Sequence, residues 1–175
     1  MEENTILTIV VAVAGIVILV VAGYQIARLL RGTIKLLMPQ TAFDPGTALT
    51  GSFELKTRKA IEGKKLIVSL IGYEIIESRR DGKTETRQQE VYRNEKIIED
   101  ARAYQAGYNK LYDFEIPAPK SSSPEFLNTD LGKTLATAAS LLTNRRSRMK
   151  WKLEARLVAK GIDLFGSKKI SINPE

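Results

Sequence analysis

Residues 5–27 read TILTIVVAVAGIVILVVAGYQIA, an apolar run in which Tyr24 is the only ionisable side chain. At about 1.5 Å of rise per residue, a helix of this length covers roughly 34 Å, which is enough to cross a hydrocarbon core about 30 Å thick. Backbone amides in lipid must be satisfied within their own segment, so the run is expected to be helical despite its many β-branched residues. The sequence therefore predicts one transmembrane span, from Thr5 to Ala27.

A cleavable signal peptide is the competing interpretation of this run. Such a peptide needs basic residues ahead of a shorter apolar core and a small-residue cleavage site behind it. Here the leading residues are Met1-Glu2-Glu3-Asn4, and the chain continues into Arg28-Leu29-Leu30-Arg31. The acidic leader, the long core and the missing cleavage site favour an uncleaved anchor.

The distribution of basic residues around the span predicts its orientation. No Lys or Arg precedes the span, whereas Arg28, Arg31 and Lys35 follow it closely. Positive charge is enriched on the cytoplasmic side of membrane spans. We therefore expect a single-pass protein of the cell membrane, with its amino terminus outside and its domain in the cytoplasm.

The stretch after the span has two interpretations. In residues 28–38, Leu30, Ile34, Leu37 and Met38 recur near helical spacing, so the segment either lies along the lipid headgroups or continues the anchor helix as far as Pro39. Residues 39–46, PQTAFDPG, are typical of a linker. The expected organisation is a tail and span over 1–27, a basic juxtamembrane segment and linker over 28–46, and a domain over 47–175.

The domain shows a period of two rather than 3.6. Phe53 and Leu55 alternate with Glu54 and Lys56, and an apolar face opposite a polar face is typical of antiparallel strands. The same alternation recurs around 66–70, 91–92, 111–116, 151–157 and 170–172. Four glycine-containing pairs are interpreted as turns between the runs: Glu62-Gly63, Asp81-Gly82 (the best hairpin candidate), Ala106-Gly107 and Phe165-Gly166.

One segment departs from this pattern. Residues 128–143, NTDLGKTLATAASLLT, are rich in Ala and Leu, and their apolar positions fall three and four apart. They predict a short helix inserted between strands. The predicted fold is therefore mainly β: a transmembrane helix followed by an antiparallel β-sandwich with one helical insertion.

The residue types needed for most catalytic sites are missing. The chain has no His and no Cys, which excludes Ser-His-Asp and Cys-His nucleophile systems and the usual zinc sites. Gly132-Lys133-Thr134 lacks the glycine and the strand that a phosphate-binding loop needs. A Ser-Lys dyad of Ser69 with Lys64 or Lys65 has no supporting signature. We predict no catalytic residue, no metal and no cofactor.

A basic cluster near the last long strand is the strongest candidate for binding. The sequence places Arg145, Arg146, Arg148 and Lys150 within six positions, and three arginines in four residues are hard to explain by packing. The net charge of +7 agrees with attraction to anionic lipid or to an acidic partner. A solvated turn and strand face is the alternative. Nucleic acid is not expected, because aromatic residues do not interleave with the basic ones.

Three stretches together resemble an arrestin-type β-sandwich. They are TGSFELKTRKAIEGKKLIVSLIGYE (50–74), YQAGYNKLYDFEIPAP (104–119) and MKWKLEARLVAKGIDLFGSKKISI (149–172). The middle stretch ends in Phe114-Glu115-Ile116-Pro117, similar to the family's F-x-x-P rim, and Trp151 takes the place of the aromatic that begins the closing strand pair. The likeness is to prokaryotic single-domain, sporulation-control-type relatives. An unrelated immunoglobulin-like sandwich is the alternative.

The resemblance implies a scaffold or adaptor that engages partners through strand edges and loops. The chain differs from receptor-desensitising arrestins in having one sandwich, an inserted helix and an anchor, so their binding residues are not transferred. We expect a non-enzymatic module held in the bilayer by residues 5–27, which recruits or organises a protein partner at the membrane. The alternatives are an accessory subunit of a larger membrane complex and, as a residual class, a membrane-anchored hydrolase.

Overall fold

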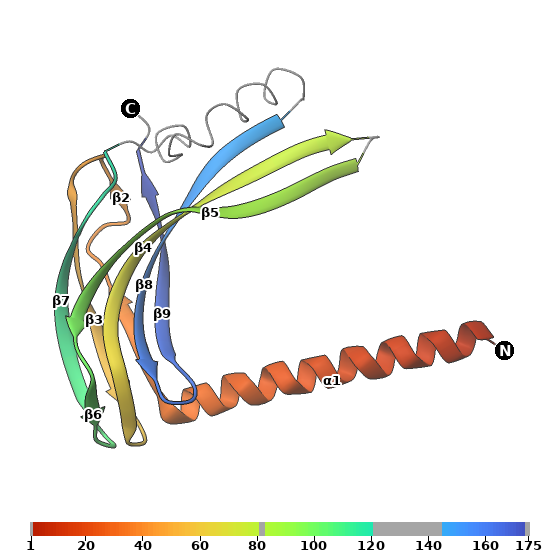
Figure 1. Ribbon diagram of the computed structural model, residues 1–175, viewed down its shortest axis with the longest axis horizontal. Coiled ribbons are helices and arrows are strands. Elements are labelled where there is room, and N and C mark those ends of the chain that lie inside the picture. The colour runs from red at the N-terminus through yellow and green to blue at the C-terminus, as the bar shows by residue number, and fades with distance from the viewer. Residues whose placement is uncertain (1, 81–82, 121–144, 174–175) are drawn as a thin grey trace.

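Two β-sheets packed face to face form the body of the protein, and a long helix projects from one end of it (Figure 1). The computed structural model describes residues 2–80, 83–120 and 145–173, with side chains described over 13–78, 83–120 and 147–173. The described elements are α1 (Glu2–Arg31), β1 (Gly32–Leu37), β2 (Ala42–Phe43), β3 (Ala48–Thr57), β4 (Ile61–Arg80), β5 (Lys83–Glu99), β6 (Arg102–Tyr104), β7 (Asn109–Pro117), β8 (Arg145–Ala159) and β9 (Leu164–Ile172).

The sheets have three and six strands among the described elements. The smaller has the order β1-β3-β7, and the larger has the order β2-β9-β8-β4-β5, with the short β6 paired to β4. All pairs are antiparallel except β2 with β9. The predicted antiparallel sandwich is therefore confirmed.

The core lies between the sheets and follows the predicted alternation. Phe53 and Leu55 of β3 are fully buried, and Leu153 and Leu157 of β8 face them from the other sheet. The rings of Phe53 and Tyr112 stack with centroids 5.2 Å apart. Burial of such side chains supplies roughly 1.5–3 kcal/mol each, which makes this two-sided interior the main source of stability.

Three strands continue past the sandwich and form a projecting arm. β4 and β5 remain paired out to Arg80 and Lys83, which confirms the hairpin strands that flank the predicted turn; Asp81 and Gly82 lie outside the described residues. β8 joins β9 only from Trp151 onward. The arm therefore consists of the outer parts of β8, β4 and β5, and in Figure 1 it leans to the same side as α1.

The predicted span lies within α1. Among the described residues, α1 is the one helix that is long and apolar enough to cross a membrane. The stretch from Val13 to Arg31 meets both conditions, and no other described part of the protein buries it. Val20 and Leu19 are largely exposed. An apolar helix that buries nothing against its own domain is expected to have lipid or another apolar surface around it.

Residues 28–31 continue the anchor helix, as one of the two interpretations predicted, whereas residues 32–46 contain two strands in place of the predicted juxtamembrane segment and linker. The helix ends at Arg31, and β1 begins at the next residue and pairs with β3 over its whole length. β2 follows within the supposed linker and pairs with β9. The helical spacing of Leu30, Ile34 and Leu37 was therefore coincidental: Leu30 lies in α1, Ile34 faces the sandwich core from β1, and Leu37 is exposed on β1.

Two glycine pairs predicted as turns lie inside strands. Gly63 is in β4, where a Cβ would come 2.6 Å from a ring carbon of Tyr104, and Gly166 is in β9, where a Cβ would collide with the carbonyl oxygen of Ile34. These glycines permit close approach rather than chain reversal. Ala106-Gly107 is a turn as predicted, with a φ of 78° at Gly107. The predicted helix over 128–143 lies outside the described residues.

Candidate functional site

The junction between α1 and the sandwich is the first candidate region. The guanidinium of Arg28 donates a hydrogen bond to the carbonyl oxygen of Phe165 in β9 and stacks on the Phe165 ring, 3.6 Å from its centroid. Arg156 approaches the same ring, 5.4 Å from its centroid. A guanidinium over an aromatic face is attracted by the ring quadrupole. Arg28 therefore holds the last turn of the helix against β9.

Arg31 makes a second attachment, one turn further along. Its side chain donates to the carbonyl oxygen of Lys160 at 3.1 Å, and its own carbonyl oxygen accepts from the backbone amides of Arg58 and Lys59. These amides satisfy an acceptor at the helix end that would otherwise lack a partner. Lys35, the third predicted juxtamembrane base, is exposed on β1. Two of the three predicted juxtamembrane bases thus contact the domain itself.

Gly32 makes the direct passage from helix to strand possible. A Cβ on this residue would collide with the carbonyl oxygen of Lys56 and come 2.9 Å from Leu164. Only glycine lets the chain pass this close to β3 and begin pairing there at once. No linker separates α1 from the sheet, since Arg31 ends one element and Gly32 begins the other.

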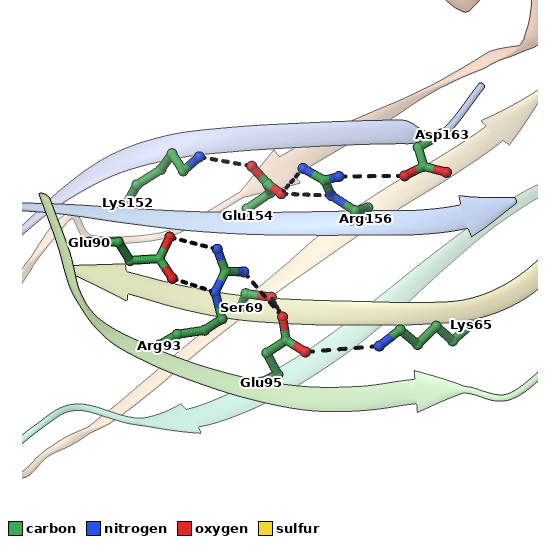
Figure 2. A network of polar contacts seen from close by, with 9 residues as sticks. All are labelled: Lys65, Ser69, Glu90, Arg93, Glu95, Lys152, Glu154, Arg156 and Asp163. Atoms are coloured by element: carbon green, nitrogen blue, oxygen red, sulfur yellow. Dashed lines mark hydrogen bonds and ion pairs between the residues drawn. The ribbon is translucent and has the colours of Figure 1, made fainter. Parts of the chain in front are cut away.

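The outer face of the six-stranded sheet carries a network of charged side chains (Figure 2). At its centre is Glu154 of β8, only 4% exposed. Its carboxylate accepts from Lys152 at 2.9 Å and from Arg156 at 2.7–2.9 Å. Arg156 also contacts Asp163, 3.4 Å away beyond the end of β8. The four residues form a line along one strand and the turn that follows it.

The protonation states in this line follow from its geometry. Burial alone would raise the pKa of Glu154, but the hydrogen bonds from Lys152 and Arg156 outweigh it, and the pKa lies below its usual range. Burial opposes the charge of Lys152, yet its bond to Glu154 leaves the Lys152 pKa raised. Glu154 and Lys152 are thus both ionised near neutral pH, and Glu154 has no proton to donate as a general acid.

A second group of polar residues lies across β4 and β5 on the same face (Figure 2). Ser69, 1% exposed, donates to Glu95 at 3.3 Å, and Lys65 lies 4.0 Å from the same carboxylate. Arg93 pairs with Glu90 at 2.7 Å and with Glu95 at 3.2 Å. Ser69 and Lys65 therefore both contact Glu95 and do not form the Ser-Lys pair considered from the sequence.

The predicted basic cluster is part of a strand rather than a turn. Arg145 and Arg146 begin β8 opposite Ser78 and Glu77, and their side chains lie outside the described set. Arg148 pairs with Glu77 at 2.8 Å, whereas Lys150 is exposed. The cluster is thus divided: the carboxylate of Glu77 already engages Arg148, and no ion pair involves Lys150 among the described residues.

The structure adds a residue that the sequence analysis missed. β8 and β9 pair so that Lys169 lies directly opposite Lys152 on the outer face, with Lys150 two residues along β8. Lys169 is exposed and, within the described side chains, takes part in no ion pair. Like charges directly opposite each other destabilise a sheet. Only the β8–β9 register places Lys169 beside Lys152, so no local sequence pattern could have revealed that pair.

The end of the sandwich at which α1 joins also holds a carboxylate with a structural role (Figure 1). Glu99 accepts from the hydroxyls of Tyr104 at 2.9 Å and Tyr112 at 2.8 Å, and pairs with Arg102 and Lys110. Burial would raise the Glu99 pKa, but the tyrosine hydroxyl bonds outweigh it and the pKa is lowered. Donors surround this carboxylate, so it ties β6 and β7 to the end of β5 rather than offering a reactive group.

No cluster of potential metal ligands was found in the described parts of the chain. The polar arrangements suit charge recognition, with basic groups in excess along β8 and β9. Arg148, Lys150, Lys152, Arg156 and Lys169 occupy outward positions there, and Glu154 is the acidic residue among them.

The fold and its projecting helix define a class: an arrestin-like β-sandwich joined to an apolar helix. No family model and no curated protein matches the sequence. Among solved structures, the chain is similar to Spo0M, a sporulation control protein from Bacillus subtilis, with a TM-score of 0.56 and 13% identity over 83% of this chain. The match covers 50% of Spo0M, so the chain spans about half of that protein's length.

A second structural match is to the alkylpurine DNA glycosylase AlkC of Pseudomonas fluorescens, bound to DNA with an abasic site analogue. Its TM-score is 0.35 at 14% identity, over 82% of this chain and 30% of AlkC. A likeness this low carries no argument about function. The similarity to Spo0M supports the arrestin-like fold and no more.

Proposed function

We propose that this protein is a membrane-tethered, non-enzymatic adaptor of the arrestin-like family, with α1 as its single membrane span and its sandwich in the cytoplasm. The observation that carries the proposal is the junction: an uncovered apolar helix runs without a linker into a sandwich whose own residues, Arg28 and Arg31, secure it. Such a joint presents the domain to a partner at the bilayer surface in a fixed orientation.

The arm offers the strand edge for that partner. Residues 83–90 of β5 are exposed, and in the described part of the chain β5 pairs with β4 alone. Nearer the sandwich, the side chains of Asn94 and Lys96 reach carbonyl oxygens of β7, at 3.5 and 3.1 Å, and cover the edge. The outer part of β5 has no such cover, and a strand edge binds an extended segment through main-chain hydrogen bonds.

Site-specific photo-crosslinking in native membranes tests this function. A photoreactive amino acid replaces Thr86, exposed on the arm part of β5, and in a matched variant replaces Asp113, exposed on β7. A protein adduct of discrete mass is expected at position 86 and not at 113. Absence of an adduct at position 86, or identical adducts at both positions, contradicts recognition by the arm.

The accessory-subunit alternative is separated by purification. When the protein is solubilised in mild detergent and purified, an adaptor is expected to be recovered mainly as a single chain with sub-stoichiometric partners. The reason is that a single strand edge makes a small interface. A constant stoichiometric complex that survives size-exclusion chromatography favours the subunit instead. Digestion of the sandwich by protease added outside intact cells overturns the cytoplasmic orientation.

A further inference from the structure

The projecting arm has a second free border, formed by the first part of β8. β8 pairs with β4 out to Arg145, but its pairing with β9 begins only at Trp151. The last residues of β9, Ser171 and Ile172, pair with β2 instead. Over residues 145–150 no other described strand therefore lies beside β8, and every second residue there directs its amide and carbonyl groups away from β4. In Figure 1 this border (blue) is the one farther from α1, and β5 forms the nearer one.

This border of the arm is strongly basic. Residues 145–150 read RRSRMK, with four bases and no acid. Glu77 of β4 pairs with Arg148 at 2.8 Å, but the Arg148 side chain stays 62% exposed, and an exposed ion pair contributes little to stability. Lys150 is exposed and enters no ion pair with the side chains that the structure describes. The border therefore keeps an excess of positive charge beside unpaired main-chain groups.

The alternation of the strand divides these residues between two faces. Arg148 and Lys150 lie on the outer face of the sheet, and Arg146 has the same place in the alternation. Ser147 and Met149 lie on the other face. A strand added beside β8 places its side chains directly opposite these, each on the same face as its neighbour. Carboxylates at every second position of such a strand meet the bases, and small or apolar residues between them face Ser147 and Met149.

We propose that residues 145–150 of β8 bind an extended acidic segment of a partner protein as an added β-strand, with Asp or Glu at alternate positions. Main-chain hydrogen bonds to β8 provide affinity, and pairs of opposite charge across the two strands provide the preference for acidic sequences. Pairing with the same border of a second copy is disfavoured, because like charges would gather there. The proposal depends neither on α1 as a membrane span nor on binding at β5. It adds a second edge to the proposed adaptor, on the opposite border of the arm.

Titration of the full-length protein, purified in an uncharged detergent, with a fluorescent peptide of alternating Glu and Thr tests strand addition by anisotropy. This peptide is expected to bind, and a peptide of alternating Lys and Thr is not. Two further probes carry N-methyl groups on all Glu amides or on all Thr amides. Only every second amide of an added strand points at β8, so one methylated form should bind at least ten times more weakly than the other. Equal binding of the two methylated forms, or of the Glu and Lys peptides, overturns the proposal.

Charge-removing variants identify the residues responsible. Arg148→Gln combined with Lys150→Gln removes two cross-strand pairs of opposite charge and should weaken binding of the Glu–Thr peptide about tenfold. The matched control, Lys35→Gln with Lys59→Gln, removes two exposed lysines from β1 and from the turn after β3, and should leave the affinity unchanged. An unchanged affinity in the Arg148/Lys150 variant, or an equal loss in the control, shows that the peptide responds to net charge alone and contradicts a site on β8.

Photo-crosslinking separates this edge from the edge of β5. A photoreactive amino acid replaces Ser147, exposed on the arm part of β8, or Thr86 on β5. The Glu–Thr peptide should form an adduct at position 147 and not at position 86. An adduct at 86 alone overturns the β8 site and leaves the proposed adaptor function standing. Conversely, failure to crosslink a native partner at 86 refutes recognition by β5, while an adduct of the peptide at 147 still supports the β8 site.

Discussion

The basic residues at the foot of α1 and those on the outer sheet face carry the same charge but are held in different ways. Arg28 and Arg31 donate to backbone carbonyls of the domain, and Arg28 also stacks on Phe165. Lys150 and Lys169 have no ion partner among the described residues. The arginines therefore hold the helix against the domain, whereas the two lysines remain exposed.

The largest expected effect on stability is at Gly32, the residue that lets α1 pass directly into β1 beside the contacts of Arg28 and Arg31. Gly32→Val places a branched side chain against the Lys56 carbonyl and Leu164, and should lower the free energy of unfolding by about 3 kcal/mol. Urea unfolding in mild detergent, followed by the fluorescence of Trp151, the only tryptophan and a buried one, measures it.

Gly15→Ala is the matched control for Gly32, because a Cβ at residue 15 meets nothing within 4 Å. It should leave the urea midpoint unchanged. If both variants unfold at the same urea concentration as the parent, the direct passage from helix to strand is not the constraint described above.

The second effect on stability is predicted for Glu154, whose carboxylate lies between Lys152 and Arg156 on the outer sheet face. Glu154→Gln removes the charge that Lys152 and Arg156 share, and should cost about 1.5 kcal/mol at pH 7. Because the Glu154 pKa is lowered by folding, its stabilisation is complete above about pH 4.3 and is lost as pH falls through the folded-state pKa.

Urea titrations between pH 7 and pH 3 check the sign of this dependence. The gap between the parent and the Glu154→Gln variant should narrow below about pH 4, since the parent then loses the same charge. A gap that widens in acid contradicts an ionised Glu154 as the stabilising species.

The third effect is on the position of the helix rather than on global unfolding. Arg28→Ala removes a cation–π contact and a hydrogen bond at the surface, together about 1 kcal/mol. In a chain labelled through Val20→Cys and Leu111→Cys, pulsed dipolar spectroscopy should show a broader distance distribution in the variant. Lys35→Ala, which changes a basic residue on β1, serves as the control and should leave the width unchanged.

The smallest effect is predicted for the lysines themselves. Lys169→Ala should change the free energy of unfolding by no more than about 0.5 kcal/mol, and toward greater stability, because it relieves the repulsion with Lys152. The same urea titration measures it. A loss above 1 kcal/mol would assign Lys169 a structural role and remove the distinction between the two groups of basic residues.

Sequence patterns succeeded where the cause is local. The alternation of Phe53 and Leu55 with polar neighbours is the pleat of β3 itself, and the apolar run from residue 5 is a property of the helix alone. Sequence patterns failed where the environment of a residue is set by a segment far away in the chain. Gly63 and Gly166 resemble turn residues until Tyr104 and Ile34 are placed against them.

The functional contacts were hidden for the same reason. Arg28 and Phe165 are 137 positions apart, and the opposition of Lys152 and Lys169 depends on the register of β8 with β9. The basic run at 145–150 was visible in the sequence, but its pairing with Glu77 across the sheet was not. Register and long-range docking therefore set the limit on what the residues alone could predict.

The direct passage from Arg31 to Gly32 has a consequence for partner choice. A domain joined to its membrane anchor by a flexible linker takes up many positions and orientations relative to the bilayer, so its binding edge can meet partners in many geometries. Here no residue separates α1 from β1, so a membrane that held α1 would also restrict how the sandwich and the edge of β5 can turn relative to it. A partner recognised by that edge, as we propose, would have to present its own binding segment in one orientation relative to α1.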